Sequence, residues 1–197
     1  MDAFREDWQR AYDMQKGGYL RRLLGCLRSP GVQAVAIFRF GHWLQARPLI
    51  LRVFLEPVYL IANGAIQVLW GIELPRSARI GAGLYIGHFG GITISPGATI
   101  GRRCNLSNNL TIGVSGQGER CGVPTIGNDV YIAPGARVFG RISIGNNVKI
   151  GANAVIYKDV PDNAIAVLAP GFRVISLKGN RPTGGVRSDH EPAATDS

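Results

Sequence analysis

Residues 125–150 read TIGNDVYIAPGARVFGRISIGNNVKI, and every sixth residue from Ile126 to Ile150 is aliphatic. Several of these residues are followed by glycine, which tolerates the backbone angles of a tight corner. A six-residue repeat marks a β-helix, in which each hexad supplies a short strand and a turn, and the stacked coils bury one continuous aliphatic column. A sandwich of alternating strands would not keep this period.

The same period extends outward from this stretch in both directions. The repeat positions are Leu74, Ile80, Ile86, Ile94, Ile100, Leu106, Ile112, Ile126, Ile132, Val138, Ile144, Ile150 and Ile156. After a gap at Asp162 we expect the period to resume at Leu168 and Val174. Each of these side chains is predicted to point into the axis of the β-helix.

Two interruptions of the repeat are the first candidates for function. The step from Ile86 to Ile94 is eight residues instead of six, so residues 87–91 are predicted to contain a two-residue bulge. Residues 113–125 form a longer, glycine-containing break, and they cannot all remain in one coil. We expect them to project as a loop. Repeat proteins place function in such insertions.

The N-terminal third of the chain reads as helical. Phe4, Trp8 and Tyr12 follow helical spacing, and Ser29-Pro30-Gly31 separates this region from a second helix at residues 32–45.

A third helical segment, residues 49–70, is strongly apolar and, at about 20 residues, long enough to span a membrane. Its apolar run is interrupted by Arg52, Glu56, Pro57, Asn63 and Gln67. Because charges at bilayer depth cost several kcal/mol each, packing against a partner helix or the base of the β-helix is favoured. Peripheral membrane contact and a true span remain open.

Charge and cysteine content exclude several classes of function. The net charge is +9, but the basic residues are dispersed, and no cluster of basic and aromatic residues indicates a nucleic-acid reader. A solvated surface is favoured over attraction to an anionic ligand, such as a phosphorylated cofactor or an acidic lipid. Three cysteines without a CxxC pair indicate neither a disulfide framework nor a zinc site. The N-terminus lacks the pattern of a secretory signal, so we expect a cytoplasmic protein, with the membrane surface as an open alternative.

Three histidines are candidates for acid–base chemistry. His42 lies among apolar residues of the second predicted helix and reads as structural, whereas His190 belongs to a tail whose composition predicts disorder. His88 lies in the bulge between glycines, where a side chain can point away from the packed axis. A neutral imidazole there can accept a proton from an attacking hydroxyl, so His88 is the candidate general base. A merely surface-exposed or buried histidine is the alternative.

Several motifs together resemble the serine acetyltransferase branch of the hexapeptide acyltransferases over about residues 30–176. They are PGVQA at 30–34, Arg39 with His42, GIE at 71–73, GHFGGI at 87–92, LTIG at 110–113, PTIG at 124–127, KDVP at 158–161 and PGFRVI at 170–175. The resemblance implies a mainly β protein, with a left-handed parallel β-helix at residues 71–176. An N-terminal helical region at 1–70 would precede it, and a disordered tail at 177–197 would follow.

The resemblance also implies roles for single residues. His88 would be the catalytic base, and Glu73, at the position where the family usually has Asp, would orient its imidazole as the acid of a catalytic triad does. Acetyl-CoA, the co-substrate, would lie between neighbouring subunits of a homotrimer or higher homo-oligomer, without a metal. The residues expected to line it are Pro134, Ala152, Lys158 and Arg173.

Departures from the family pattern bear on the acceptor. Serine enzymes carry Asp before the catalytic histidine, and Arg-His before the proline that closes the loop. Here these positions are Gly87, Gly122 and Val123. A zwitterion would lose two charge-assisted contacts, each worth about 1.5–3 kcal/mol. We therefore expect a sugar hydroxyl in polysaccharide biosynthesis as acceptor. Glu119 and Arg120 of the loop are candidates to hydrogen-bond the sugar, and a solvated ion pair is the alternative.

The alternative is O-acetylation of L-serine for cysteine biosynthesis, and a remote one is a non-enzymatic scaffold. A zinc carbonic anhydrase shares this fold but needs three histidines on one metal. Only His88 lies in the repeat region, so that function is disfavoured.

Overall fold

The computed structural model describes residues 2–115 and 121–168. Four helices come first: α1 (Asp2–Met14), α2 (Tyr19–Arg28), α3 (Pro30–Gln45) and α4 (Leu49–Trp70). The first helical region is thus two helices, because the chain turns at Gly17, whose φ of 111° favours glycine. Pro30 does not precede the next helix but begins it, since proline fits the first helical turn.

Fourteen short strands follow within the described residues. They are β1 (Ile72–Glu73), β2 (Arg79–Ile80), β3 (Tyr85–Ile86), β4 (Ile92–Ile94), β5 (Thr99–Ile100), β6 (Asn105–Leu106), β7 (Thr111–Gly113), β8 (Thr125–Ile126), β9 (Tyr131–Ile132), β10 (Arg137–Phe139), β11 (Ser143–Ile144), β12 (Lys149–Ile150), β13 (Val155–Ile156) and β14 (Ile165–Ala166).

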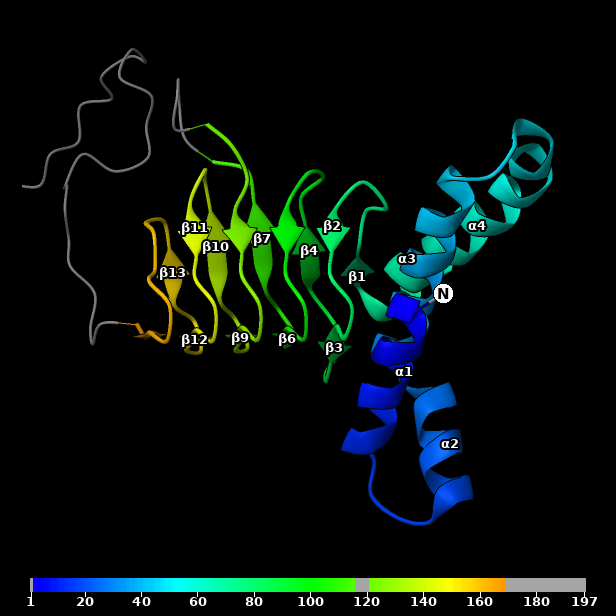
Figure 1. The fold of residues 1–197 in the computed structure, drawn as a ribbon, viewed down its shortest axis with the longest axis horizontal. Helices are drawn as coiled ribbons and strands as arrows, with labels where there is room; N and C mark the ends of the chain where they lie inside the picture. Colours follow the sequence, from blue (N-terminus) through cyan, green and yellow to red (C-terminus); the bar gives the residue numbers. More distant parts are fainter. Residues whose placement is uncertain (1, 116–120, 169–197) are drawn as a thin grey trace, which may run out of the picture.

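Each strand from β4 to β13 pairs in parallel with the strand three places earlier, and β14 pairs with β12, which produces three sheets around one axis (Figure 1). The first face holds β1-β4-β7-β10-β13, the second β2-β5-β8-β11, and the third β3-β6-β9-β12-β14. The repeat residues from Leu74 to Ile156 are all buried, with exposures between 0% and 9%, so the prediction of an inward aliphatic column is confirmed. Burying a residue of this size stabilises the fold by about 1.5–3 kcal/mol.

Strand register confirms the two-residue bulge in the first coil. Glu73 pairs with Thr93, twenty residues on, whereas Thr93 pairs with Thr111 after eighteen. The long break is also confirmed as a departure from the coil, because Thr111 pairs with Arg137 after twenty-six residues. Both insertions leave the strand pairing intact.

The last coil corrects the prediction at Leu168. Lys149 pairs with Ile165 after only sixteen residues, because this coil is two residues short, and the inward positions become Val160 and Ala166. Leu168 is 54% exposed. Val174 lies outside the described residues.

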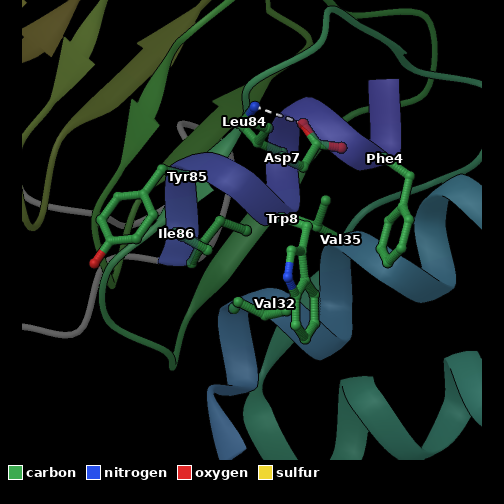
Figure 2. A pocket seen from close by; sticks show the side chains of 10 residues that line it. Phe4, Asp7, Trp8, Val32, Val35, Leu84, Tyr85 and Ile86 are labelled. Carbon is green, nitrogen blue, oxygen red and sulfur yellow. Dashed lines mark hydrogen bonds between the residues drawn. The ribbon is translucent and has the colours of Figure 1, made fainter. Parts of the chain in front are cut away.

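A buried ion pair attaches the helices to the first coil. Arg39 Nε donates to Asp7 Oδ2 at 2.8 Å, and its terminal nitrogens donate to the carbonyls of Ile80 and Gly81 at 2.7 and 2.6 Å. Asp7 is 3% exposed, and its Oδ1 also accepts the backbone N–H of Leu84 at 2.8 Å (Figure 2). The pair therefore joins α1, α3 and the first coil, and every charge in it is compensated.

Apolar packing around this ion pair closes the end of the β-helix. Figure 2 shows Phe4 and Trp8 of α1 beside Val32 and Val35 of α3, next to the β3 turn. A side chain at Gly31 would place its Cβ 2.2 Å from the Ile86 carbonyl oxygen, so glycine lets α3 lie directly on β3.

We predict that Asp7→Ala lowers the free energy of unfolding, measured by urea denaturation, by about 3–5 kcal/mol, because it leaves Arg39 buried and unpaired. Asp13→Ala is the matched control. Asp13 pairs with Arg22 from a side chain that is 60% exposed, so its removal should change the same quantity by about 0.5 kcal/mol or less. Equal effects would show that the buried pair does not hold the helices in place.

Candidate functional site

His88 lies in the turn that carries the chain from β3 on the third face to β4 on the first face. The bulge is built by Gly90 and Gly91, whose φ values of 97° and 66° disfavour other residues. Gly87, His88 and Phe89 are exposed. The imidazole is therefore held outside the packed axis, where a substrate can reach it.

Two contacts fix this bulge to its neighbours. The Phe89 ring lies edge-on to Trp70, the last residue of α4, with ring centroids 5.3 Å apart. The Asn109 N–H of the next coil donates to the Gly90 carbonyl at 2.7 Å. Asn109 is in turn held by Arg137, whose Nη2 donates to the Asn109 side chain at 3.1 Å and whose Nη1 donates to its carbonyl.

Arg137 and Asn109 thus support the turn that carries His88, although sequence reasoning did not select them. The sequence offers a partial indication for Asn109, because asparagine tolerates positive φ at a corner, and φ of Asn109 is 53°. The contact with Arg137 comes from the strand pairing of β7 with β10 and has no counterpart in the repeat pattern.

Glu73 is the second residue of β1 and is exposed on the first face. Its neighbours along this face are Thr93 and Thr111, in register. The His88 turn enters the same face at the start of β4. No hydrogen bond joins the Glu73 carboxylate to the imidazole within the described part of the chain, so the orienting role of Glu73 stays a prediction.

The edge where the third face meets the first collects the catalytic candidate and part of the expected acetyl-CoA site. Pro134 follows β9 and Ala152 follows β12, at the same corner as His88 in later coils. Both are exposed. This edge therefore presents a line of small, accessible residues beside the base, which suits an extended ligand.

The other expected cofactor residues do not lie there. Lys158 follows β13, at the edge where the first face leads to the second, and its Nζ lies 5.7 Å from the centroid of the Tyr157 ring. Arg173 lies outside the described residues. A single chain therefore does not bring Lys158 together with Pro134 and Ala152.

The loop after β7 leaves from that second edge too. Ser115 and Gly122 exchange two backbone hydrogen bonds of 3.1 Å and form its narrow base, which projects from the upper side of the β-helix in Figure 1, whereas β3 lies on the lower side. The base of the loop, at Ser115 and Gly122, and the His88 turn therefore lie on different edges of the β-helix. Glu119 and Arg120 lie outside the described residues.

The loop positions that depart from the family pattern have a particular environment. Val123 is half-buried against the core. A Cβ at Gly122 would lie 2.9 Å from the Cβ of Arg141 and 3.1 Å from its Nε, so the Arg141 side chain lies across this glycine. Sequence reasoning missed Arg141, which places a cation beside the position where the family carries one.

The remaining candidates are structural. His42 Nδ1 lies 3.2 Å from the Arg76 carbonyl oxygen, so its polar atom has a partner, as predicted, although the side chain is exposed. Burial raises the pKa of the Cys104 thiol and keeps it unreactive. In residues 2–115 and 121–168, no group of three or more metal-binding side chains occurs.

Comparisons with known proteins agree with this architecture. The model of the bacterial transferase hexapeptide family (six repeats) matches residues 124–158. A serine acetyltransferase from Synechococcus elongatus is 37% identical over 154 residues, which cover 77% of this chain and 59% of the relative. One from Helicobacter pylori is 36% identical over 141 residues, which cover 70% of this chain and 77% of the relative.

Among solved structures, the serine acetyltransferase of Brucella abortus in complex with coenzyme A superposes with a TM-score of 0.70 at 27% identity, over 86% of this chain and 65% of that one. Isoform 3 from Entamoeba histolytica in complex with cysteine gives 0.68 at 28% identity, over 89% and 60%. The chain thus spans about three fifths of the first of these relatives. The left-handed β-helix fold is confirmed, and the chain belongs to the serine acetyltransferase family of hexapeptide-repeat transferases.

Proposed function

We propose that this protein is an acetyl-CoA-dependent O-acetyltransferase whose acceptor is L-serine. The observation that carries the proposal is the similarity to serine acetyltransferases at 36–37% identity over 70–79% of the chain. It supports serine over the sugar that the departures at Gly87, Gly122 and Val123 favoured. The structure adds that a turn built by glycines holds His88 exposed, where it can act as the base.

In this proposal, neutral His88 accepts the proton of the serine hydroxyl while the hydroxyl oxygen attacks the thioester carbonyl. The carbon–sulfur bond then breaks, and the imidazolium returns the proton to the departing thiolate, so that His88 ends unchanged. Glu73 would accept the other imidazole N–H and stabilise the cation. Pro134 and Ala152 would line the pantetheine along the edge below His88.

Arg141 supplies a positive charge beside Gly122, the position at which serine enzymes carry arginine. Its guanidinium, which extends across that glycine, would pair with the serine carboxylate as a planar, bidentate donor. The ion pairs of the described residues do not include Arg141.

Assembly follows from the placement of the two edges. His88, Pro134 and Ala152 lie on one edge of the first face, and Arg141, the loop and Lys158 lie towards the other. A neighbouring subunit that presents its second edge to the first edge of this one would complete the site, and a homotrimer closes such an interface in a ring.

A sugar acceptor is the second candidate, because Gly87 and Gly122 leave space that the family fills with charged side chains. It would use the same base and the same thioester.

We predict that His88→Ala lowers turnover by about 10² to 10⁴, the usual contribution of a positioned general base, with little change in acetyl-CoA affinity. Glu73→Gln should cost less, because the imidazole remains but is less well oriented. His42→Ala is the matched control and should retain turnover, since among the described residues the only hydrogen-bond partner of its imidazole is the Arg76 carbonyl. Thiol release from acetyl-CoA measures all three, and wild-type turnover in His88→Ala would overturn the mechanism.

L-Serine should be used with a kcat/KM of about 10⁴ M⁻¹ s⁻¹ or more, within the usual enzyme range. We predict that Arg141→Ala raises the KM for serine about tenfold or more, because one charge-assisted contact is lost, and leaves the KM for acetyl-CoA unchanged. Arg79→Ala, which removes another exposed arginine, is the control.

Nucleotide sugars and short oligosaccharides belong in the same assay. Faster acetylation of a sugar than of serine, together with improved serine kinetics in a Gly122→Arg, Val123→His variant, would make the sugar the acceptor.

Light scattering should give a mass three times, or a multiple of three times, the 21.2 kDa of one chain. A stable monomer with full activity would contradict the shared site.

A further inference from the structure

Helix α4 presents an apolar stripe outward along its length. Only Tyr59 and Ile66 of its 22 residues are buried. The outward positions follow helical spacing and are 55–85% exposed: Ile50, Phe54, Val58, Ile61 and Val68. By length and composition α4 could cross a membrane, yet only 6% of its most apolar window is buried within the protein, so it is not a core helix.

The charged side chains of α4 turn the other way. Glu56 pairs with Arg76 of the first coil at 2.6 Å, and Arg76 holds the pKa of the Glu56 carboxyl below its usual range. Arg52 Nε and Glu56 Oε2 each expose less than 1 Å² to solvent, although both residues are only half-buried overall. A helix facing water turns its charges outward and its leucines inward. The reversed arrangement indicates that the outer face of α4 meets an apolar environment.

The way in which α4 is attached to the rest of the protein favours a helix that lies along a membrane over one that crosses it. Helices α3 and α4 are joined by a short turn and pack together, and the far ends of both meet the same end of the β-helix, at Gly31 and Gly71 (Figure 1). A span would draw α3, with the Arg39–Asp7 pair, into the hydrocarbon.

Charge identifies the occupant of this surface. From Tyr19 to Trp70 the chain carries six arginines and one acidic residue, Glu56, which pairs with Arg76. Two of the arginines, Arg22 and Arg39, pair with Asp13 and Asp7, so the ion pairs of the described residues leave out Arg21, Arg28, Arg47 and Arg52. Helix α2 also exposes Leu20, Leu24 and Leu27, at 65%, 43% and 54%, between its arginines. A second copy of the helices would bring like charge, whereas an anionic bilayer complements arginines that lie beside exposed leucines.

We propose that α4, assisted by α2, lies in the interface of a membrane rich in anionic lipid, with the outward stripe of α4 inserted at the level of the headgroups. This peripheral attachment is independent of the acceptor that the enzyme uses. The proposed membrane contact uses the helices α4 and α2, and not the edge of the β-helix that carries His88, Pro134 and Ala152.

Co-sedimentation with lipid vesicles tests the proposal without any activity measurement. Full-length protein should bind vesicles that contain phosphatidylglycerol and phosphatidylcholine more tightly than vesicles of phosphatidylcholine alone, and salt should weaken the binding. Phe54→Ser with Ile61→Ser should reduce binding about tenfold or more. Because both residues are more than 70% exposed, these changes leave the fold intact, which circular dichroism checks.

Val155→Ser with Ile165→Ser is the matched control. It removes two exposed apolar side chains from the β-helix, at 51% and 71%, and should bind vesicles as the wild type does. Absence of vesicle binding by the wild type would overturn the proposal, as would equal binding by the Phe54, Ile61 variant. So would a wild-type assembly that the Phe54, Ile61 substitutions dissociate in light scattering, because the stripe would then be covered by a second copy.

Discussion

Strand register between successive coils is the constraint on which this structure depends. An aliphatic side chain reaches the axis only if its strand pairs with the strand one coil earlier, so extra residues are tolerated only at corners. The first coil takes two extra residues at the His88 turn and the third takes eight in the loop, while Ile94, Ile112 and Val138 still stack. The site is thus made of residues that the core does not need.

The same constraint divides the functional residues between two edges. Every corner after a strand of the third face lies on one edge, which gives His88, Pro134 and Ala152 a common line. Every corner after a strand of the first face lies on the other, which holds the loop and Lys158. Residues close in sequence are therefore separated by a whole face, and residues far apart in sequence are neighbours.

This division explains what the sequence could and could not predict. Inward residues recur every six positions, so the sequence alone predicts the aliphatic column and both insertions. The last coil was not, because Val160 and Leu168 are both aliphatic, and only strand pairing shows that two residues are missing. The position of Arg141 over Gly122, and that of Arg137 under the His88 turn, depend on contacts between coils that leave no pattern in the sequence.

Two contacts link the end of α4 to the turn that carries His88. Trp70 ends α4 and packs against Phe89, the residue after His88, while Gly71 in the left-handed region turns the chain directly into β1. The Ile92 N–H at the end of the bulge donates to the Gly71 carbonyl at 2.9 Å. The His88 turn is thus bound to the end of α4 by packing and by a backbone hydrogen bond. Any surface on which α4 rests therefore sets the orientation of His88, and the edge that carries His88, Pro134 and Ala152 runs away from that surface along the β-helix.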